Sequence, residues 1–128
     1  MKINIPASIG ELFDKITILE IKKERIDDSK KKIEIYKELN LLIKIVKKKK
    51  LRTRKLSTYI KELKKINTKL WNVEDKLRKF ENNKSFNKDF IMKARSVYFM
   101  NDKRAKFKNE INQLTNSKII EVKSYEKY

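Results

Sequence analysis

Residues 56–80, LSTYIKELKKINTKLWNVEDKLRKF, carry the most regular hydrophobic pattern in the chain. Within them, apolar side chains recur alternately three and four positions apart. This spacing forms an a/d seam, which is typical of helices that pack side by side along their length. The segment therefore predicts one long helix, whose seam consists of Leu56, Tyr59, Leu63, Ile66, Leu70, Val73, Leu77 and Phe80.

Two further helices are expected before this segment. The sequence Ser8-Ile9-Gly10-Glu11 is a capping box, in which Ser8 and Glu11 bond to each other's backbone amides, so a helix should begin at Ile9. This helix is apolar on two sides, because Ile18 and Ile21 lie off its main stripe, and such a helix is usually central in a bundle. Asp27-Asp28-Ser29 should end it and cap a second helix, whose expected buried face is Ile33, Tyr36, Leu39, Leu42 or Ile43, and Val46.

The rest of the chain completes the predicted architecture. The polar segment 81–85 should separate the seam helix from a fourth helix running from about Lys88 to Leu114. The seam phase slips across residues 47–55, which indicates a turn, although the absence of Gly and Pro there also allows a continuous helix. Residues 2–5 alternate in polarity, and with the tail 118–125 they could form a short strand pair. We expect an all-α helical bundle of about four helices, including a long antiparallel hairpin, in a single domain 1–128.

Composition excludes several classes of functional site. The chain has no Cys or His, so it offers no zinc site of the usual kind, no disulfide, no thiol nucleophile and no imidazole base. Its single Gly excludes the Gly-rich phosphate loops, which need several glycines. No export signal and no apolar run long enough to span a membrane is evident, so the expected location is the cytoplasm, and no cofactor or metal is expected.

The net charge of +18 suggests a polyanion partner, but the residues that carry the charge weaken this hypothesis. Of the 35 basic residues, 29 are Lys and only 6 are Arg, and the chain is also rich in Ile and Asn, which is typical of AT-rich coding sequences. Non-specific, salt-dependent binding of nucleic acid remains one hypothesis, because base-stacking aromatic residues are nearly missing near the basic run. Its candidate residues are Lys44, Lys47, Lys48, Lys49, Lys50, Arg52, Arg54 and Lys55.

The predicted fourth helix has a stripe that changes character along its length. On a helical projection, Phe90, Ala94 and Val97 share one direction with Asn101, Lys108 and Asn112. Buried Asn and Lys need partners, so this face must either meet polar groups, water or a ligand, or lie at a frayed and exposed helix end.

The seam helix carries a second polar feature, on its outer side. Trp71, Glu74, Asp75 and Arg78 are spaced i, i+3, i+4 and i+7 and therefore share one face. They could form only a surface ion pair over a Trp. Alternatively, they could form an interface that receives the fourth helix or the Glu11, Asp14, Lys15 edge of the first.

Three blocks of the sequence are familiar. Residues 5–22, IPASIGELFDKITILEIK, residues 70–78, LWNVEDKLR, and residues 94–105 around Arg95, Tyr98 and Asn101 resemble an uncharacterised bacterial family, domain of unknown function 6165. The resemblance extends over nearly the whole chain and implies no activity. The lysine run at 47–50 falls outside these blocks.

We therefore weigh two main functional hypotheses. The first is a non-enzymatic module that binds an anionic small molecule or a partner protein in a polar cleft, with arginines gripping a carboxylate or phosphate. The second is a small helical enzyme acting on a dianionic substrate, by fold-level analogy with helical chorismate mutases only. A homodimer is also plausible. The ligand-binding candidates are Glu11, Asp14, Lys15, Trp71, Glu74, Asp75, Arg78, Arg95, Tyr98, Asn101, Asp102 and Arg104.

Overall fold

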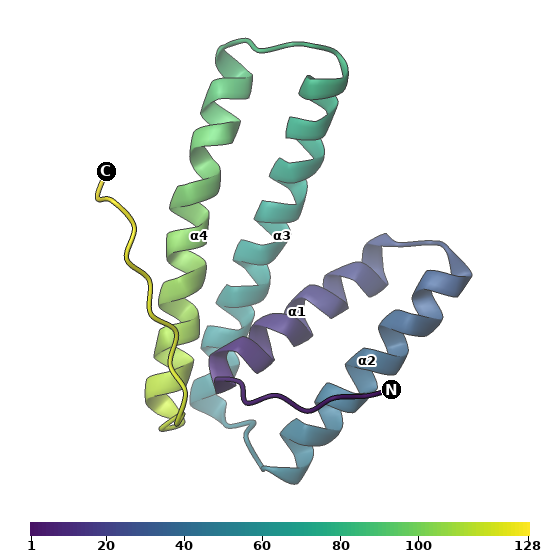
Figure 1. Cartoon of the computed structure of the whole chain (residues 1–128), viewed down its shortest axis with the longest axis vertical. Coiled ribbons are helices and arrows are strands. Elements are labelled where there is room, and N and C mark those ends of the chain that lie inside the picture. Colours follow the sequence, from purple (N-terminus) through teal and green to yellow (C-terminus); the bar gives the residue numbers. More distant parts are fainter.

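A computed structural model describes residues 1–128 as four helices and no strand. The helices are α1 (Ile9–Arg25), α2 (Ser29–Lys48), α3 (Arg54–Asn82) and α4 (Lys88–Leu114). The two long helices α3 and α4 form an antiparallel hairpin, and the shorter α1–α2 hairpin packs across one end of it (Figure 1). The all-α class, the four helices and the long hairpin are confirmed.

Each helix begins at a side-chain cap that the sequence supplies. Ser8, Asp28, Thr53 and Asn87 precede α1 to α4, and each side-chain oxygen accepts from the amide three residues on. The predicted starts at Ile9 and Lys88 are therefore confirmed. Only half of the predicted capping box forms, because Ser8 accepts from the Glu11 amide at 3.1 Å while the exposed Glu11 carboxylate makes no return bond.

The helix ends use left-handed residues other than glycine. Lys50, Lys84 and Asn116 have φ values of 51°, 52° and 50°. In each turn the next amide bonds back to a carbonyl of the last helical turn, as in Leu51 N to Val46 O at 3.1 Å. The helix is thus interrupted within the segment 47–55, by a turn at residues 49–53, and the alternative of a continuous helix is wrong.

The core lies where the two hairpins cross, and α1 is its centre. The backbone of α1 approaches all three other helices, whereas that of α2 approaches only α1. This confirms the expectation from the two apolar sides of α1. The core residues are Phe13, Ile16, Leu19, Ile35, Leu39, Val46, Leu56, Ile60, Leu63, Ile66 and Ile111.

The predicted buried face of α2 is only partly correct. Leu39 and Val46 are buried, but Ile33 and Tyr36 are exposed and Ile35 takes their place. At 100° per residue, Ile35 lies within about 40° of Leu39, whereas Ile33 lies about 160° from Ile35. The sequence offered apolar residues on both sides of this helix, and contact with α1 selects one side.

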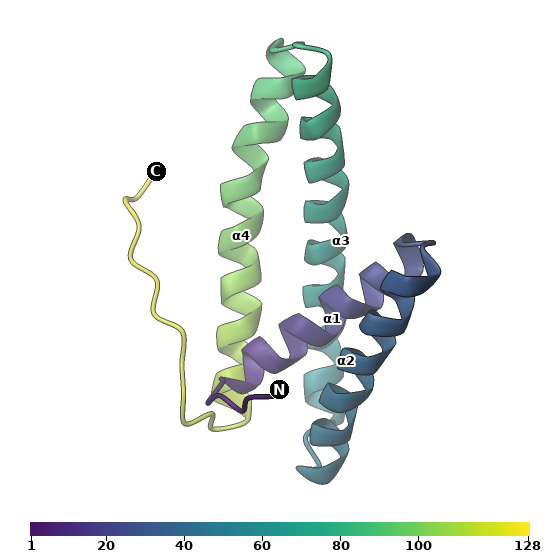
Figure 2. The same ribbon diagram turned by 45° about the vertical axis from the view of Figure 1, so that its right-hand side comes forward.

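Half of the long hairpin projects beyond the core. The α1–α2 hairpin covers only the end where α3 begins and α4 ends (Figure 2). Accordingly, the α3 seam is buried at Leu56, Leu63 and Ile66 but only partly covered from Leu70 to Phe80. At the far tip, Phe90 packs edge-on against Phe80 and Phe86.

The predicted strand pair at the chain ends does not form. Residues 1–7 are extended and exposed, and the C-terminal tail, residues 118–128, follows α4 rather than the N-terminal segment (Figure 1). Contacts with α4 described below explain this course, because polar and aromatic side chains of the tail find partners there. No helix has the length and apolar character needed to cross a bilayer.

Candidate functional site

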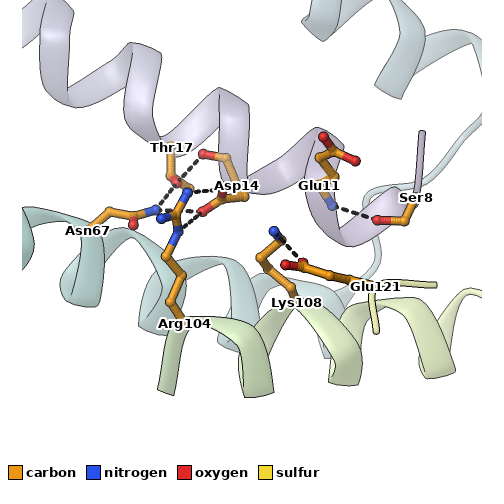
Figure 3. Close-up of polar contacts among 8 residues, drawn as sticks. All are labelled: Ser8, Glu11, Asp14, Thr17, Asn67, Arg104, Lys108 and Glu121. Atoms are coloured by element: carbon orange, nitrogen blue, oxygen red, sulfur yellow. Dashed lines mark hydrogen bonds and ion pairs between the residues drawn. The ribbon is translucent and has the colours of Figure 1, made fainter. Parts of the chain in front are cut away.

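A buried carboxylate and an arginine join the two hairpins. Asp14 of α1, whose side chain is 6% exposed, accepts two hydrogen bonds from Arg104 of α4: Nε to Oδ1 at 2.9 Å and Nη2 to Oδ2 at 2.6 Å (Figure 3). This bidentate geometry is the strongest form of a carboxylate–arginine pair. These hydrogen bonds hold the pKa of Arg104 above its usual value, although partial burial opposes the shift.

A third helix completes the network around Asp14. Asn67 of α3 donates from Nδ2 to Asp14 Oδ1 at 2.9 Å and to Thr17 Oγ1 at 3.0 Å. The Thr17 hydroxyl donates in turn to the Asp14 carbonyl at 2.8 Å (Figure 3). One polar cluster (Asp14, Thr17, Asn67 and Arg104) thus ties together α1, α3 and α4 inside the bundle.

One turn away, α1 and α4 meet at their closest point. The Gly10 amide donates to Asn112 Oδ1 at 2.6 Å, and the Cα of Gly10 faces the Lys108 carbonyl with no room for a side chain. Lys108 is nearly buried and pairs with Glu121 of the tail at 2.5 Å (Figure 3). Lys108 and Asn112 of the α4 stripe are therefore buried against polar partners, although the Asn112 Nδ2 has none, and the alternative of a frayed, exposed helix end is wrong.

A hollow of about 330 Å³ lies beside the polar cluster, between α1 and α3. Most of the surface that lines the hollow is apolar, although polar residues also contribute to it. Arg104 contributes to this lining from α4. We call it the α1–α3 hollow. Its apolar residues are Ile18, Ile21, Leu70 and Trp71, and its polar residues are Asn67, Glu74, Asp75, Arg78 and Arg104.

A second, polar groove of about 460 Å³ lies between α4 and the tail. Its cations already have partners: Lys108 pairs with Glu121, and Lys123 pairs with Asp102 at 2.6 Å. Tyr128 also bonds to Asp102. The groove is lined by Asn101, Arg104, Ala105, Lys108, Glu121, Val122, Lys123, Ser124 and Tyr125.

The contacts at Asp102 also shift pKa values. Hydrogen bonds from Lys123 and Tyr128 hold the pKa of Asp102 below its usual value. The same carboxylate raises the pKa of the Tyr128 hydroxyl, because the protonated hydroxyl is the form that can donate. The Tyr128 ring also packs on Tyr98 and Phe99, with centroids 5.3 and 4.6 Å apart.

The predicted site residues separate into three groups. Trp71, Glu74, Asp75, Arg78 and Arg104 line the α1–α3 hollow, with Asp14 directly behind Arg104. Asn101, Asp102 and Tyr98 lie on the tail side of α4. Glu11, Lys15 and Arg95 are exposed outside both, with Lys15 only 3.6 Å from Glu38.

Arg95 is separated from Arg104 by helix geometry. Nine residues at 100° each place the two side chains on opposite sides of α4. One polar cleft holding Arg78, Arg95 and Arg104 together is therefore not present. Arg78 is itself highly exposed and only 3.6 Å from Glu74.

Three residues of the polar network fell outside the predicted set. Asn67 lies beside the seam residue Ile66 without interrupting the seam, as many exposed polar residues do, so its burial had no distinct sequence signal. Gly10, the only glycine, sits in a helix, where glycine usually marks close packing. Thr17 gave no sequence signal, because threonine on a helix commonly bonds only to its own backbone.

The eight cations of the basic run line neither the α1–α3 hollow nor the groove between α4 and the tail. All eight of its predicted cations are exposed, at the end of α2, in the following turn and at the start of α3. None of the eight cations forms an ion pair within the protein, so their positive charges face the solvent.

The family resemblance is confirmed by comparison with known proteins. A family model described as "Family of unknown function (DUF6165)" matches residues 1–128, and the chain belongs to this family. No curated protein and no solved structure matches the chain.

Proposed function

We propose that this member of the family of unknown function is a non-enzymatic binding module. The α1–α3 hollow takes an apolar group that carries one carboxylate, either a small molecule or a segment of a partner protein. The observation that carries the proposal is Arg104, which is fixed by the buried Asp14 and lines the mainly apolar hollow.

Arg104 can bind an anionic group without changing the orientation of its guanidinium. Its Nε and Nη2 are engaged by Asp14, which fixes the plane of the guanidinium, while Nη1 makes no hydrogen bond within the protein. A fixed donor next to apolar walls is a common way to orient a ligand, because the walls supply affinity and the donor supplies direction. Arg78 at the rim adds a second positive charge that can move.

The pairing of Arg104 with Asp14 favours a binding module over an enzyme that acts on a dianionic substrate. An enzyme that clamps a dianion needs several cations free of carboxylate partners. Around the hollow, Arg104 is paired with Asp14, and Arg78 is near Glu74 and open to water. Asp75 also lines the hollow without an ion pair, so three carboxylates stand against two arginines, and only the Nη1 of Arg104 is left to receive a single carboxylate.

Trp71 provides a direct test, because it is the only Trp and lines the hollow. Its emission should shift when octanoate is titrated into the protein and should stay unchanged with octanol. A blocked Leu-Glu dipeptide amide, titrated in the same way, tests whether the hollow binds a segment of a partner protein. Binding of octanoate alone favours a small molecule, and binding of the dipeptide alone favours a partner segment.

Two arginine variants provide a matched control. Arg78→Gln should weaken octanoate binding about threefold, as expected for loss of an exposed charge contact. Arg95→Gln makes the same chemical change on an exposed arginine that does not line the hollow and should leave binding unchanged. Equal weakening by both variants would show that octanoate responds to net charge alone, and an unresponsive Trp71 would refute the hollow as a binding site.

A further inference from the structure

The outer face of α2 carries exposed apolar residues beside exposed lysines. Leu41 and Ile45 are 41% and 44% exposed, although both are large aliphatic residues. At 100° per residue they form one row, and Lys44 and Lys48 form the neighbouring row. Among the helices, α2 contacts only α1, so no other helix covers this face.

The positive charge at this end of the molecule is uncompensated. No Asp or Glu occurs between Leu39 and Lys61. None of the eight exposed cations from Lys44 to Lys55 makes an ion pair, whereas cations on α1, α3 and α4 do. Their attraction for a polyanion is therefore opposed only by ions in solution.

We infer that this basic–apolar surface, consisting of Leu41, Ile45 and the eight cations, binds the surface of an anionic lipid bilayer. Clustered lysines attract anionic headgroups, and adjacent aliphatic side chains enter the boundary between headgroups and acyl chains. The protein lies on the bilayer without spanning it.

The apolar row distinguishes a bilayer from nucleic acid as the partner. Binding to a phosphate backbone would use the lysines but would leave Leu41 and Ile45 facing water. The surface also has only two arginines, and residues 41–55 include no aromatic residue that could stack on a base. A bilayer matches both the charge and the aliphatic side chains.

Sedimentation of the full chain with lipid vesicles tests the inference. The protein should bind vesicles of phosphatidylcholine containing about 40% phosphatidylglycerol at about 50 mM salt and should not bind phosphatidylcholine alone. Raising salt to about 500 mM should release most of it. Absence of binding to the anionic vesicles at low salt would overturn the inference.

Three double variants separate the contributions, with helical circular dichroism confirming that each is folded. Lys44→Glu with Lys48→Glu should reduce affinity about tenfold or more. Leu41→Ser with Ile45→Ser leaves the charge unchanged and should reduce it about fivefold. Lys69→Glu with Lys76→Glu, two exposed lysines of α3 without ion pairs, changes net charge equally and should reduce affinity less than about twofold.

Two outcomes would contradict the lipid partner. If the Leu41 and Ile45 variant binds vesicles as tightly as the unchanged protein, the apolar row does not enter the bilayer. If that variant binds both vesicles and duplex DNA as tightly as the unchanged protein does, the surface is a general polyanion site. Selective loss of vesicle binding by this variant, with DNA binding unaffected, supports the inference.

Discussion

Gly10 of α1 lies against the backbone carbonyl of Lys108 in α4, closer than any side chain would allow. A Cβ built on Gly10 would collide with that carbonyl oxygen and would lie 2.9 Å from Asn112 Oδ1. The contact lets the Gly10 amide reach Asn112 at 2.6 Å. The single glycine of the chain therefore fixes how closely the short hairpin approaches the long one.

Gly10→Ala should destabilise the protein by about 2–3 kcal/mol, as overpacking against rigid backbone does. The direction is informative, because alanine inside a helix would otherwise be favoured over glycine by up to about 1 kcal/mol. Urea unfolding measures the difference. Lys69→Ala, at an exposed helical position, is the control and should change stability by less than about 0.5 kcal/mol. A Gly10→Ala protein as stable as the original would show that the helices can separate freely.

Asp14→Asn should cost about 2–3 kcal/mol of unfolding free energy, because it leaves the partly buried Arg104 without its charge partner. Glu74→Gln is the matched control, since it removes the carboxylate of an exposed pair with Arg78 and should cost at most about 0.5 kcal/mol. Similar losses for both variants would place Asp14 among ordinary surface ion pairs.

The sequence predicted the helices well because their signals are local. The caps at Ser8 and Asp28 and the a/d seam of α3 depend on residues a few positions apart. Both caps were found where expected, and the seam is buried in its first half, where Ile60 is buried beside it. The alternation of residues 2–5 is equally local but insufficient, because a strand needs a neighbour and the tail instead bonds to α4.

The candidate site was harder to predict because it depends on contacts between helices. The Trp71 to Arg78 face was found from spacing, but its neighbours Ile18 and Ile21 follow only from the crossing of α1 over α3. Grouping Arg95 with Arg104 overlooked their spacing, because nine residues at 100° each already place the two side chains on opposite sides of one helix. Asn67 was missed because its role requires Asp14, 53 residues earlier in the chain.

Lys50→Gly should stabilise the protein by about 0.5–1 kcal/mol, because Lys50 occupies the left-handed region at φ 51° and glycine does so without strain. Lys48→Gly, two residues earlier in the last turn of α2, should destabilise it by about 0.5–1 kcal/mol. Both variants remove one exposed lysine, so opposite shifts in the urea midpoint isolate the backbone effect. Equal shifts of the urea midpoint would mean that loss of the lysine charge, and not the backbone conformation, determines the change in stability.

Docking of the tail on α4 should depend on pH at both extremes. The lowered pKa of Asp102 means that its contribution is present above the usual value of 3.8 and is lost as pH falls through the lowered pKa. The raised pKa of Tyr128 means that its contribution is present below the usual 10.0 and is lost as pH rises through the raised pKa. Amide NMR shifts of residues 120–128 should therefore report a docked tail at neutral pH and a released tail at both extremes of pH.

Asp102→Asn tests the same tether at neutral pH. It should bring the shifts of residues 120–128 close to those of a free peptide, because Lys123 loses its charge partner. Asp89→Asn, in the first turn of α4, removes an equal charge far from the tail and should leave those shifts unchanged. A tail that stays docked in Asp102→Asn would be held by the Lys108–Glu121 pair and by the packing of Tyr128 on Tyr98 and Phe99.

Thr17→Val should cost about 1 kcal/mol, because it removes the hydroxyl that accepts from Asn67 across the α1–α3 interface while preserving shape. Thr68→Val is the control: its hydroxyl also bonds to a carbonyl of its own helix, Lys64 O at 2.8 Å, but has no partner on another helix. Such back-bonds do not stabilise a helix, so Thr68→Val should change stability by less than about 0.5 kcal/mol. The difference between the two unfolding free energies measures the interhelical hydrogen bond. Equal values would mean that Asn67 is held by Asp14 alone.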